Sequence, residues 1–121
     1  MTRRSVNSTA VDLLQHEFAQ ESASALGRLG RVFEAALAAL REFDAKLAGA
    51  DAPAASRDSR AALVHEASVA LWHFIVQREA CGLRDMRYVL REYRVPPEVS
   101  ARMGMIVPAG PGHGGGRRKS Y

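Results

Sequence analysis

The chain has 121 residues, of which 47% are hydrophobic and 25% charged, which suits one globular domain and excludes a disordered chain. Its single cysteine excludes an internal disulfide and agrees with a reducing, cytoplasmic compartment. The formal net charge is +4, but five basic residues lie in the two tails, and without them 12 basic residues stand against 13 acidic ones. A body so close to neutrality argues against a dedicated nucleic-acid-binding domain.

Alanine dominates the hydrophobic content, with 21 residues. Alanine has the highest helix propensity and lets helices approach closely, so the composition predicts an all-α protein. The most apolar stretch, residues 67–76, is too short to cross a bilayer. No apolar segment follows Arg3 and Arg4, so we expect neither a signal peptide nor a membrane location.

The first predicted helix runs from Ala10 to Ala48. Thr9, with Asp12 three positions later, resembles a capping box at its start, and Gly49 supplies the stop. The second half of this helix carries apolar residues at alternating spacings of three and four, which is typical of a coiled-coil face. These residues are Leu26, Leu29, Phe33, Ala36, Leu40, Phe43 and Leu47.

Two glycines, Gly27 and Gly30, interrupt this first helix. Each costs about 1 kcal/mol relative to alanine inside a helix. They mark a kink, or they let another helix cross closely; we expect a continuous helix.

Small residues form the connection at 49–57, and Asp58 or Ser59 is predicted to cap the second helix. That helix runs to about Cys81, and Gly82 fits the left-handed position that ends a helix in a Schellman motif.

Two short helices are predicted after this point. Asp85 can cap the first, Met86–Tyr93, which Pro96 prevents from continuing. The second spans Pro97–Met103 and ends at Gly104. The domain organisation is therefore a flexible lead-in (1–8), a helical domain (9–106) and a disordered, Gly-rich basic tail (107–121).

The second helix is apolar over an arc wider than one neighbouring helix can cover. We therefore expect an antiparallel hairpin of two long helices that dimerises into a four-helix bundle. The residues predicted at this dimer interface are Leu26, Leu29, Phe33, Leu40, Phe43, Trp72 and Phe74.

Four arginines, Arg84, Arg87, Arg91 and Arg94, follow a 3-4-3 spacing that places them on one helical face. In one interpretation they pair with first-helix acids, such as Glu17 and Glu21, and are part of the architecture. In another they bind an acidic protein or a small anion. In a third they bind nucleic acid.

The segment Asp85–Gly104 has the outline of a helix-turn-helix, which together with the basic tails suggests a small nucleic-acid-associated regulator as the alternative function. Its second helix would read the bases, yet Arg102 is its only cation. Nucleic acid is therefore the less favoured partner.

Candidate catalytic groups are few, and we expect no enzyme activity, cofactor or metal. His65 and Glu66 begin like a zinc-protease motif, but Val69 stands where the second histidine would be. Glu66 and His73 could share a face without a third ligand. Cys81 lies at a helix C-terminus, where the helix dipole disfavours a thiolate.

Two runs, QREACGLRD at 77–85 and YRVPPEV at 93–99, resemble segments of short uncharacterised bacterial proteins that form a domain-of-unknown-function family. The resemblance extends over roughly residues 10–104. It implies a small helical protein with no assigned activity and supplies no catalytic residues. The expected function is a helical homo-oligomeric structural or protein-interaction module.

Overall fold

The computed structural model describes residues 2–48 and 54–106, with side chains from residue 9 onward. These residues form four helices and no strand, which confirms the all-α prediction. The predicted tail, residues 107–121, lies outside the described residues. The helices are α1 (Thr2–Leu47), α2 (Ala54–Ala80), α3 (Met86–Glu92) and α4 (Pro97–Ile106).

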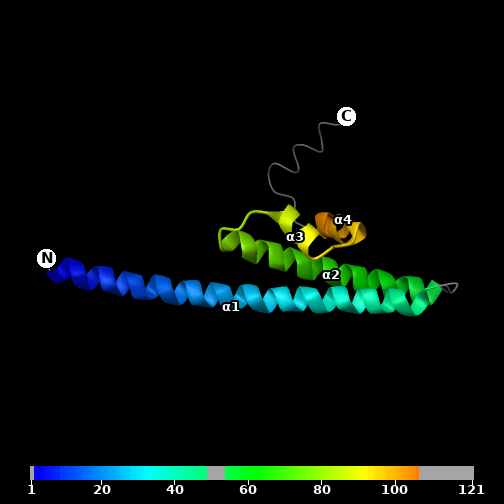
Figure 1. Ribbon diagram of the computed structural model, residues 1–121, viewed down its shortest axis with the longest axis horizontal. Helices are drawn as coiled ribbons and strands as arrows, with labels where there is room; N and C mark the ends of the chain where they lie inside the picture. Colours follow the sequence, from blue (N-terminus) through cyan, green and yellow to red (C-terminus); the bar gives the residue numbers. More distant parts are fainter. Residues whose placement is uncertain (1, 49–53, 107–121) are drawn as a thin grey trace, which may run out of the picture.

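The two long helices form the predicted antiparallel hairpin, α4 packs against α2, and α3 lies on the same side of the hairpin as α4 (Figure 1). The two long helices start earlier than predicted. The helix α1 begins at Thr2 rather than Ala10, and α2 begins at Ala54 rather than after Asp58 or Ser59. Helical propensity in the alanine-rich approach to α2 is stronger than the local capping signals.

The helix α1 continues through Gly27 and Gly30 without a break. Gly30 is buried, and a Cβ atom added there would lie 3.2 Å from Cε1 of Phe74. Of the two explanations for the glycines, close approach therefore applies at Gly30: the missing side chain makes room for an aromatic ring of α2.

The core lies between the second half of α1 and α2. Phe33, Leu37 and Leu40 are 0–1% exposed, and Phe74 is 3% exposed. The rings of Phe33 and Phe74 lie 6.0 Å apart between centroids, and Tyr93 lies 5.5 Å from each. This aromatic cluster joins α1 and α2 to the segment that follows α3.

This burial changes the predicted dimer interface. Phe33, Leu40 and Phe74 belong to the core of one chain, because α1, α2 and Tyr93 cover one another. Of the other members, Leu26, Leu29, Phe43 and Trp72 are partly buried within the same chain. The spacing correctly found the packed face of α1, but α2 of the same chain occupies it.

The helix α4 covers part of the wide apolar arc of α2, while Val76 stays 47% exposed. Val99 and Met103 are buried against α2, and the fully buried hydroxyl of Ser68 lies 3.0 Å from the carbonyl oxygen of Val99. The predicted end at Gly104 is wrong: α4 continues to Ile106, since one exposed glycine costs only about 1 kcal/mol of helix propensity.

A guanidinium links three helices at the closed end of the hairpin. Arg60 of α2 donates two hydrogen bonds to the carboxylate of Asp44 on α1 (2.7 and 3.0 Å) and two to that of Glu98 on α4 (both 2.7 Å). The pKa values of both carboxyl groups are lowered, chiefly because each accepts hydrogen bonds from Arg60. The pKa of Arg60 is raised, first by Glu98 and then by Asp44.

The predicted Schellman ending of α2 is confirmed. Gly82 has φ of 89°, its N–H donates to the carbonyl of Glu79 (3.0 Å), and the N–H of Leu83 donates to that of Arg78 (2.8 Å). This turn reverses the chain so that α3 comes back along α2.

The first half of α1 extends beyond the rest of the molecule (Figure 1). The end of α2 lies level with Ser22, whose carbonyl oxygen is 3.4 Å from Nε2 of Gln77 and 3.9 Å from Sγ of Cys81. Every residue from 9 to 21 is exposed.

Candidate partner-binding surface

The four arginines singled out in the sequence are all exposed. Arg87 and Arg91 lie one turn apart on α3, on the side away from the fully buried Val89. Arg84 lies in the connection before α3 and Arg94 in the turn after it, so the prediction of one continuous helical face is wrong for these two. The Schellman turn at Gly82 delays the start of α3 until after Arg84.

The predicted pairing of these arginines with acids of α1 is not found. Among the described residues, no side chain of the four makes an ion pair or hydrogen bond. Glu17 and Glu21 lie on the part of α1 beyond the end of α2, and neither forms an ion pair with any residue that the structure describes. The four guanidiniums, which we call the arginine surface, are therefore available to a partner.

Another arginine, Arg41, supports the turn that carries Arg94. Nη2 of Arg41 on α1 donates to the carbonyl oxygens of Tyr93 (2.9 Å) and Arg94 (3.0 Å). Arg94 has φ of 51°, and the N–H groups of Arg94 and Val95 close a Schellman turn on Arg91 and Leu90. The left-handed conformation is costly for a residue with a Cβ, so Arg41 stabilises the turn by satisfying its two outward carbonyls.

Asp85 does not cap α3 as predicted. Its carboxylate accepts a hydrogen bond from Nη2 of Arg78 (3.0 Å), and its side chain makes no capping bond. The Arg78 guanidinium also lies 5.7 Å from the ring centroid of Phe74 and 5.6 Å from that of Tyr88. Because Asp85 is neutralised by Arg78, Glu92 is the remaining acid on α3 beside the arginine surface.

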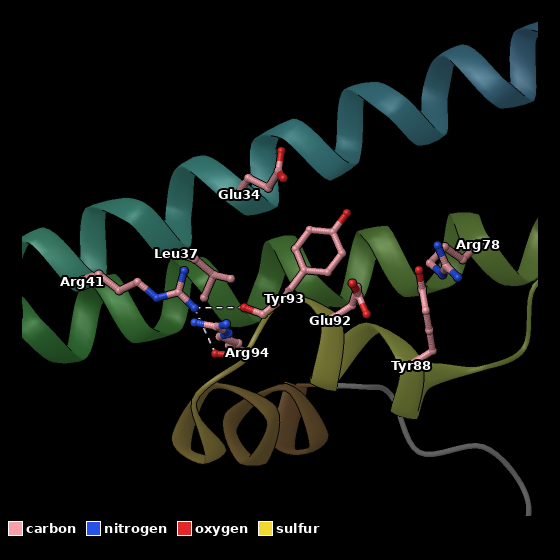
Figure 2. A pocket seen from close by; sticks show the side chains of 8 residues that line it. All are labelled: Glu34, Leu37, Arg41, Arg78, Tyr88, Glu92, Tyr93 and Arg94. Carbon is pink, nitrogen blue, oxygen red and sulfur yellow. Dashed lines mark hydrogen bonds between the residues drawn. The ribbon is translucent and has the colours of Figure 1, made fainter.

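A groove of about 560 Å³ borders the arginine surface, between α1, α2 and α3 (Figure 2). Glu34 of α1 and Glu92 of α3 supply carboxylates, Tyr88 and Tyr93 supply phenols, and Arg94 lies at one end. The pKa of Tyr93 is raised, mainly by burial and next by the negative charge of Glu34, so its phenol stays protonated and can donate a hydrogen bond. The groove therefore offers donors and acceptors, with Arg94 of the arginine surface in its lining.

The histidines and the cysteine considered as candidate catalytic groups lie apart from one another in the described part of the chain. Within 2–48 and 54–106, no three His, Cys, Asp or Glu side chains lie close enough together to hold a metal ion. Nδ1 of His65 accepts a hydrogen bond from Nε of Arg102 (3.3 Å), and the ring of His73 lies 5.5 Å from that of Trp72. Cys81 is partly buried against the Ser22 carbonyl.

The helix-turn-helix outline of Asp85–Gly104 corresponds to α3 and α4. The helix that would enter a groove of DNA, α4, packs Val99 and Met103 on α2, and its Glu98 and Arg102 contact Arg60 and His65. None of the described helices is long and apolar enough to cross a membrane.

Sequence reasoning missed the two arginines that organise this end of the molecule, Arg41 and Arg60. Each contacts groups far along the chain: Arg41 lies 52 positions from Tyr93, and Arg60 lies 38 from Glu98. No local pattern marks such partners, and both residues look like ordinary cations on the exposed side of a helix.

Residues 1–111 match the model of a family described as "Family of unknown function (DUF6665)". The chain belongs to this family. The match covers all the described helices and confirms the expected resemblance to a domain of unknown function. Comparison with curated proteins and with solved structures gives no match.

Proposed function

We propose that this member of DUF6665 is a protein-interaction module that binds an acidic protein segment through the arginine surface. The observation that carries the proposal is that some arginines bond to other parts of the fold and others do not. Arg41, Arg60 and Arg78 are engaged within the fold, whereas Arg84, Arg87, Arg91 and Arg94 are exposed without an ion pair among the described residues. Four unpaired cations over so short a segment repel one another, and an acidic ligand relieves that repulsion.

The neighbouring groove favours a peptide over a bare anion. The phenol of Tyr93 and the carboxylates of Glu34 and Glu92 can bond to peptide groups, while the arginines outside the groove pair with acidic side chains. The two carboxylates in the groove would repel a small anion, so binding has to begin at the outer arginines.

The test is titration of the full chain with a fluorescein-labelled octaglutamate peptide, followed by fluorescence anisotropy. Reversing two charges with Arg87→Glu and Arg91→Glu should weaken binding about tenfold or more, because interfacial charge pairs contribute strongly to such contacts. The matched control carries Arg31→Glu and Arg57→Glu, which change net charge equally at two exposed positions outside the surface. If both double variants lost the same affinity for the peptide, binding would depend on net charge alone, which would contradict the proposal.

The same experiment also tests the alternative function, nucleic-acid binding. Titration with a 20-base-pair duplex should give weaker binding than the peptide. Salt-dependent duplex binding that disappears on removing residues 109–121 would assign it to the basic tail, whereas duplex binding lost with Arg87→Glu and Arg91→Glu would replace the acidic partner with DNA.

A further inference from the structure

The extended first half of α1 carries large apolar side chains that nothing in the described chain covers. Val11 is 50% exposed, Leu14 66% and Phe18 71%. Spacings of three and four place these residues on one face of the helix. A helical segment without tertiary contacts is marginally stable in water, so a partner on this face would stabilise the whole segment.

A second apolar feature lies on the hairpin, on the flank that α3 and α4 leave open. It is a groove of about 520 Å³ lined only by residues of α1 and α2. On α1 its lining consists of Val32, 52% exposed, and three alanines. The complete lining from α1 is Val32, Ala35, Ala36 and Ala39, faced on α2 by the apolar residues Leu63, Val69 and Ala70 and the polar residues His65, Glu66 and His73.

The two features belong to one heptad stripe along α1. Val11, Phe18, Val32 and Ala39 are separated by multiples of seven residues, and Leu14 and Ala35 by three heptads. Positions seven apart return to nearly the same face of a helix, with a drift of about 20° per heptad that supercoiling removes. The stripe is therefore large at its N-terminal end and small at its C-terminal end.

We propose that a second copy of the chain docks antiparallel on this stripe, with Leu14 and Phe18 of each copy seated in the alanine-lined groove of the other. When Phe18 lies opposite Ala35, Leu14 lies opposite Ala39, so each large side chain meets a small one. This is the knob-and-hole complementarity of antiparallel helices. The assembly buries α1 and α2 of both copies together as a four-helix arrangement, with an interface different from the one expected from sequence.

Symmetry favours the antiparallel arrangement over a parallel one. A two-fold axis across the middle of α1 forms the contact twice and closes the assembly at two copies. A parallel pair would place Phe18 on Phe18 and alanine on alanine, crowding one end and leaving the grooves empty. The charges are also complementary in this register, because Glu21 of one copy lies within about one turn of Arg28 of the other.

The proposed dimer does not depend on the proposed function. The arginine surface and its groove lie on the flank that carries α3, whereas the docking groove lies between α1 and α2 on the open flank. Failure of peptide binding would leave the dimer intact, and a monomeric chain could still bind an acidic peptide.

Sedimentation velocity of the full chain tests the proposal. The wild type should sediment as a dimer at about 50 µM, and Leu14→Asp with Phe18→Asp should raise the dissociation constant about 100-fold, because both side chains would be central to the interface. The matched control is Leu13→Asp: Leu13 is also exposed, at 61%, but lies about 100° around the helix from Leu14. It should remain dimeric.

The groove side is tested by Ala39→Glu, at an exposed position where the isolated fold tolerates the longer side chain. It should also yield monomers, with unchanged circular dichroism. A monomeric wild type, or a dimer that survives both Leu14→Asp with Phe18→Asp and Ala39→Glu, would overturn the proposal.

Cysteine crosslinking checks the register in a Cys81→Ser background. Phe18→Cys combined with Ala35→Cys should form a disulfide-linked dimer, since the two positions are about 25 Å apart along one helix and cannot pair within a chain. Efficient crosslinking by Phe18→Cys alone would show a parallel pair and overturn the antiparallel register.

Discussion

The two halves of α1 have the same helical periodicity and opposite surroundings. In the second half, Phe33, Leu37 and Leu40 are almost fully buried against α2. In the first half, Leu14 and Phe18 are mostly exposed, because α2 ends level with Ser22. Apolar spacing along a helix thus identifies a face that can be buried, while the length of the neighbouring helix decides whether the same chain buries it.

The comparison predicts a large difference between two phenylalanines of the same helix. Phe33→Ala removes a ring from the core and should lower the free energy of unfolding by about 3–5 kcal/mol. Phe18→Ala, measured at a protein concentration where the chain is monomeric, should change it by only about 0.5 kcal/mol. Urea denaturation followed by circular dichroism measures both, and similar losses would mean that the first half of α1 is already packed within one chain.

The closed end of the hairpin should respond to pH through Arg60. Arg60→Ala should cost about 1–2 kcal/mol, since the hydrogen bonds are charge-assisted but Arg60, Asp44 and Glu98 are 32%, 45% and 49% exposed, which weakens them. Arg57→Ala is the control, at an exposed position on the same helix.

The sign of the pH effect follows from the lowered pKa values of Asp44 and Glu98. The folded chain binds fewer protons than the unfolded chain, so the stabilisation is present above the ordinary carboxyl pKa of 4.5 for Glu98 and is lost as the pH falls below it. Denaturation of wild type and Arg60→Ala at pH 7 and pH 3 should give a smaller difference at pH 3. If the stability difference between wild type and Arg60→Ala were the same at both pH values, the ion pairs of Arg60 would not account for it.

The two glycines of α1 should give the smallest effects, and Gly27→Ala should be the more stabilising of the two substitutions. At Gly27 an added Cβ meets only Nη1 of Arg31, at 3.4 Å, so Gly27→Ala should stabilise by about 0.5–1 kcal/mol through helix propensity. At Gly30 the ring of Phe74 lies within 3.2 Å, and the strain should cancel the gain or reverse it. Thermal unfolding of both variants distinguishes them; equal stabilisation would mean that the Phe74 ring moves aside freely.

Local signals in the sequence were sufficient for most of the fold. The all-α class, the hairpin, the packed face of α1 and the turn at Gly82 follow from periodicity and helix-ending chemistry, which act over a few residues. The start of α2 was missed because its alanine-rich first residues favour helix before the predicted caps, and the end of α4 was missed because one exposed glycine does not end a helix. The burial of Phe33, Leu40 and Phe74 depends on α2 and Tyr93, which are distant in sequence.

The candidate surface was predicted only in part. The 3-4-3 spacing drew attention to the correct four arginines, and the structure leaves them exposed. It could not show that α3 is too short to hold Arg84 and Arg94, nor that Asp85 pairs with Arg78 instead of capping the helix. Those outcomes depend on the turns that Gly82 and Arg41 stabilise.

Hydrogen exchange at two protein concentrations tests most directly the claim that the first half of α1 is completed by a second copy. The amides of residues 9–21 should exchange slowly at about 100 µM and at least tenfold faster after dilution to a monomeric concentration, while those of residues 33–40 stay protected at both. Exchange of residues 9–21 that does not change with concentration would contradict it.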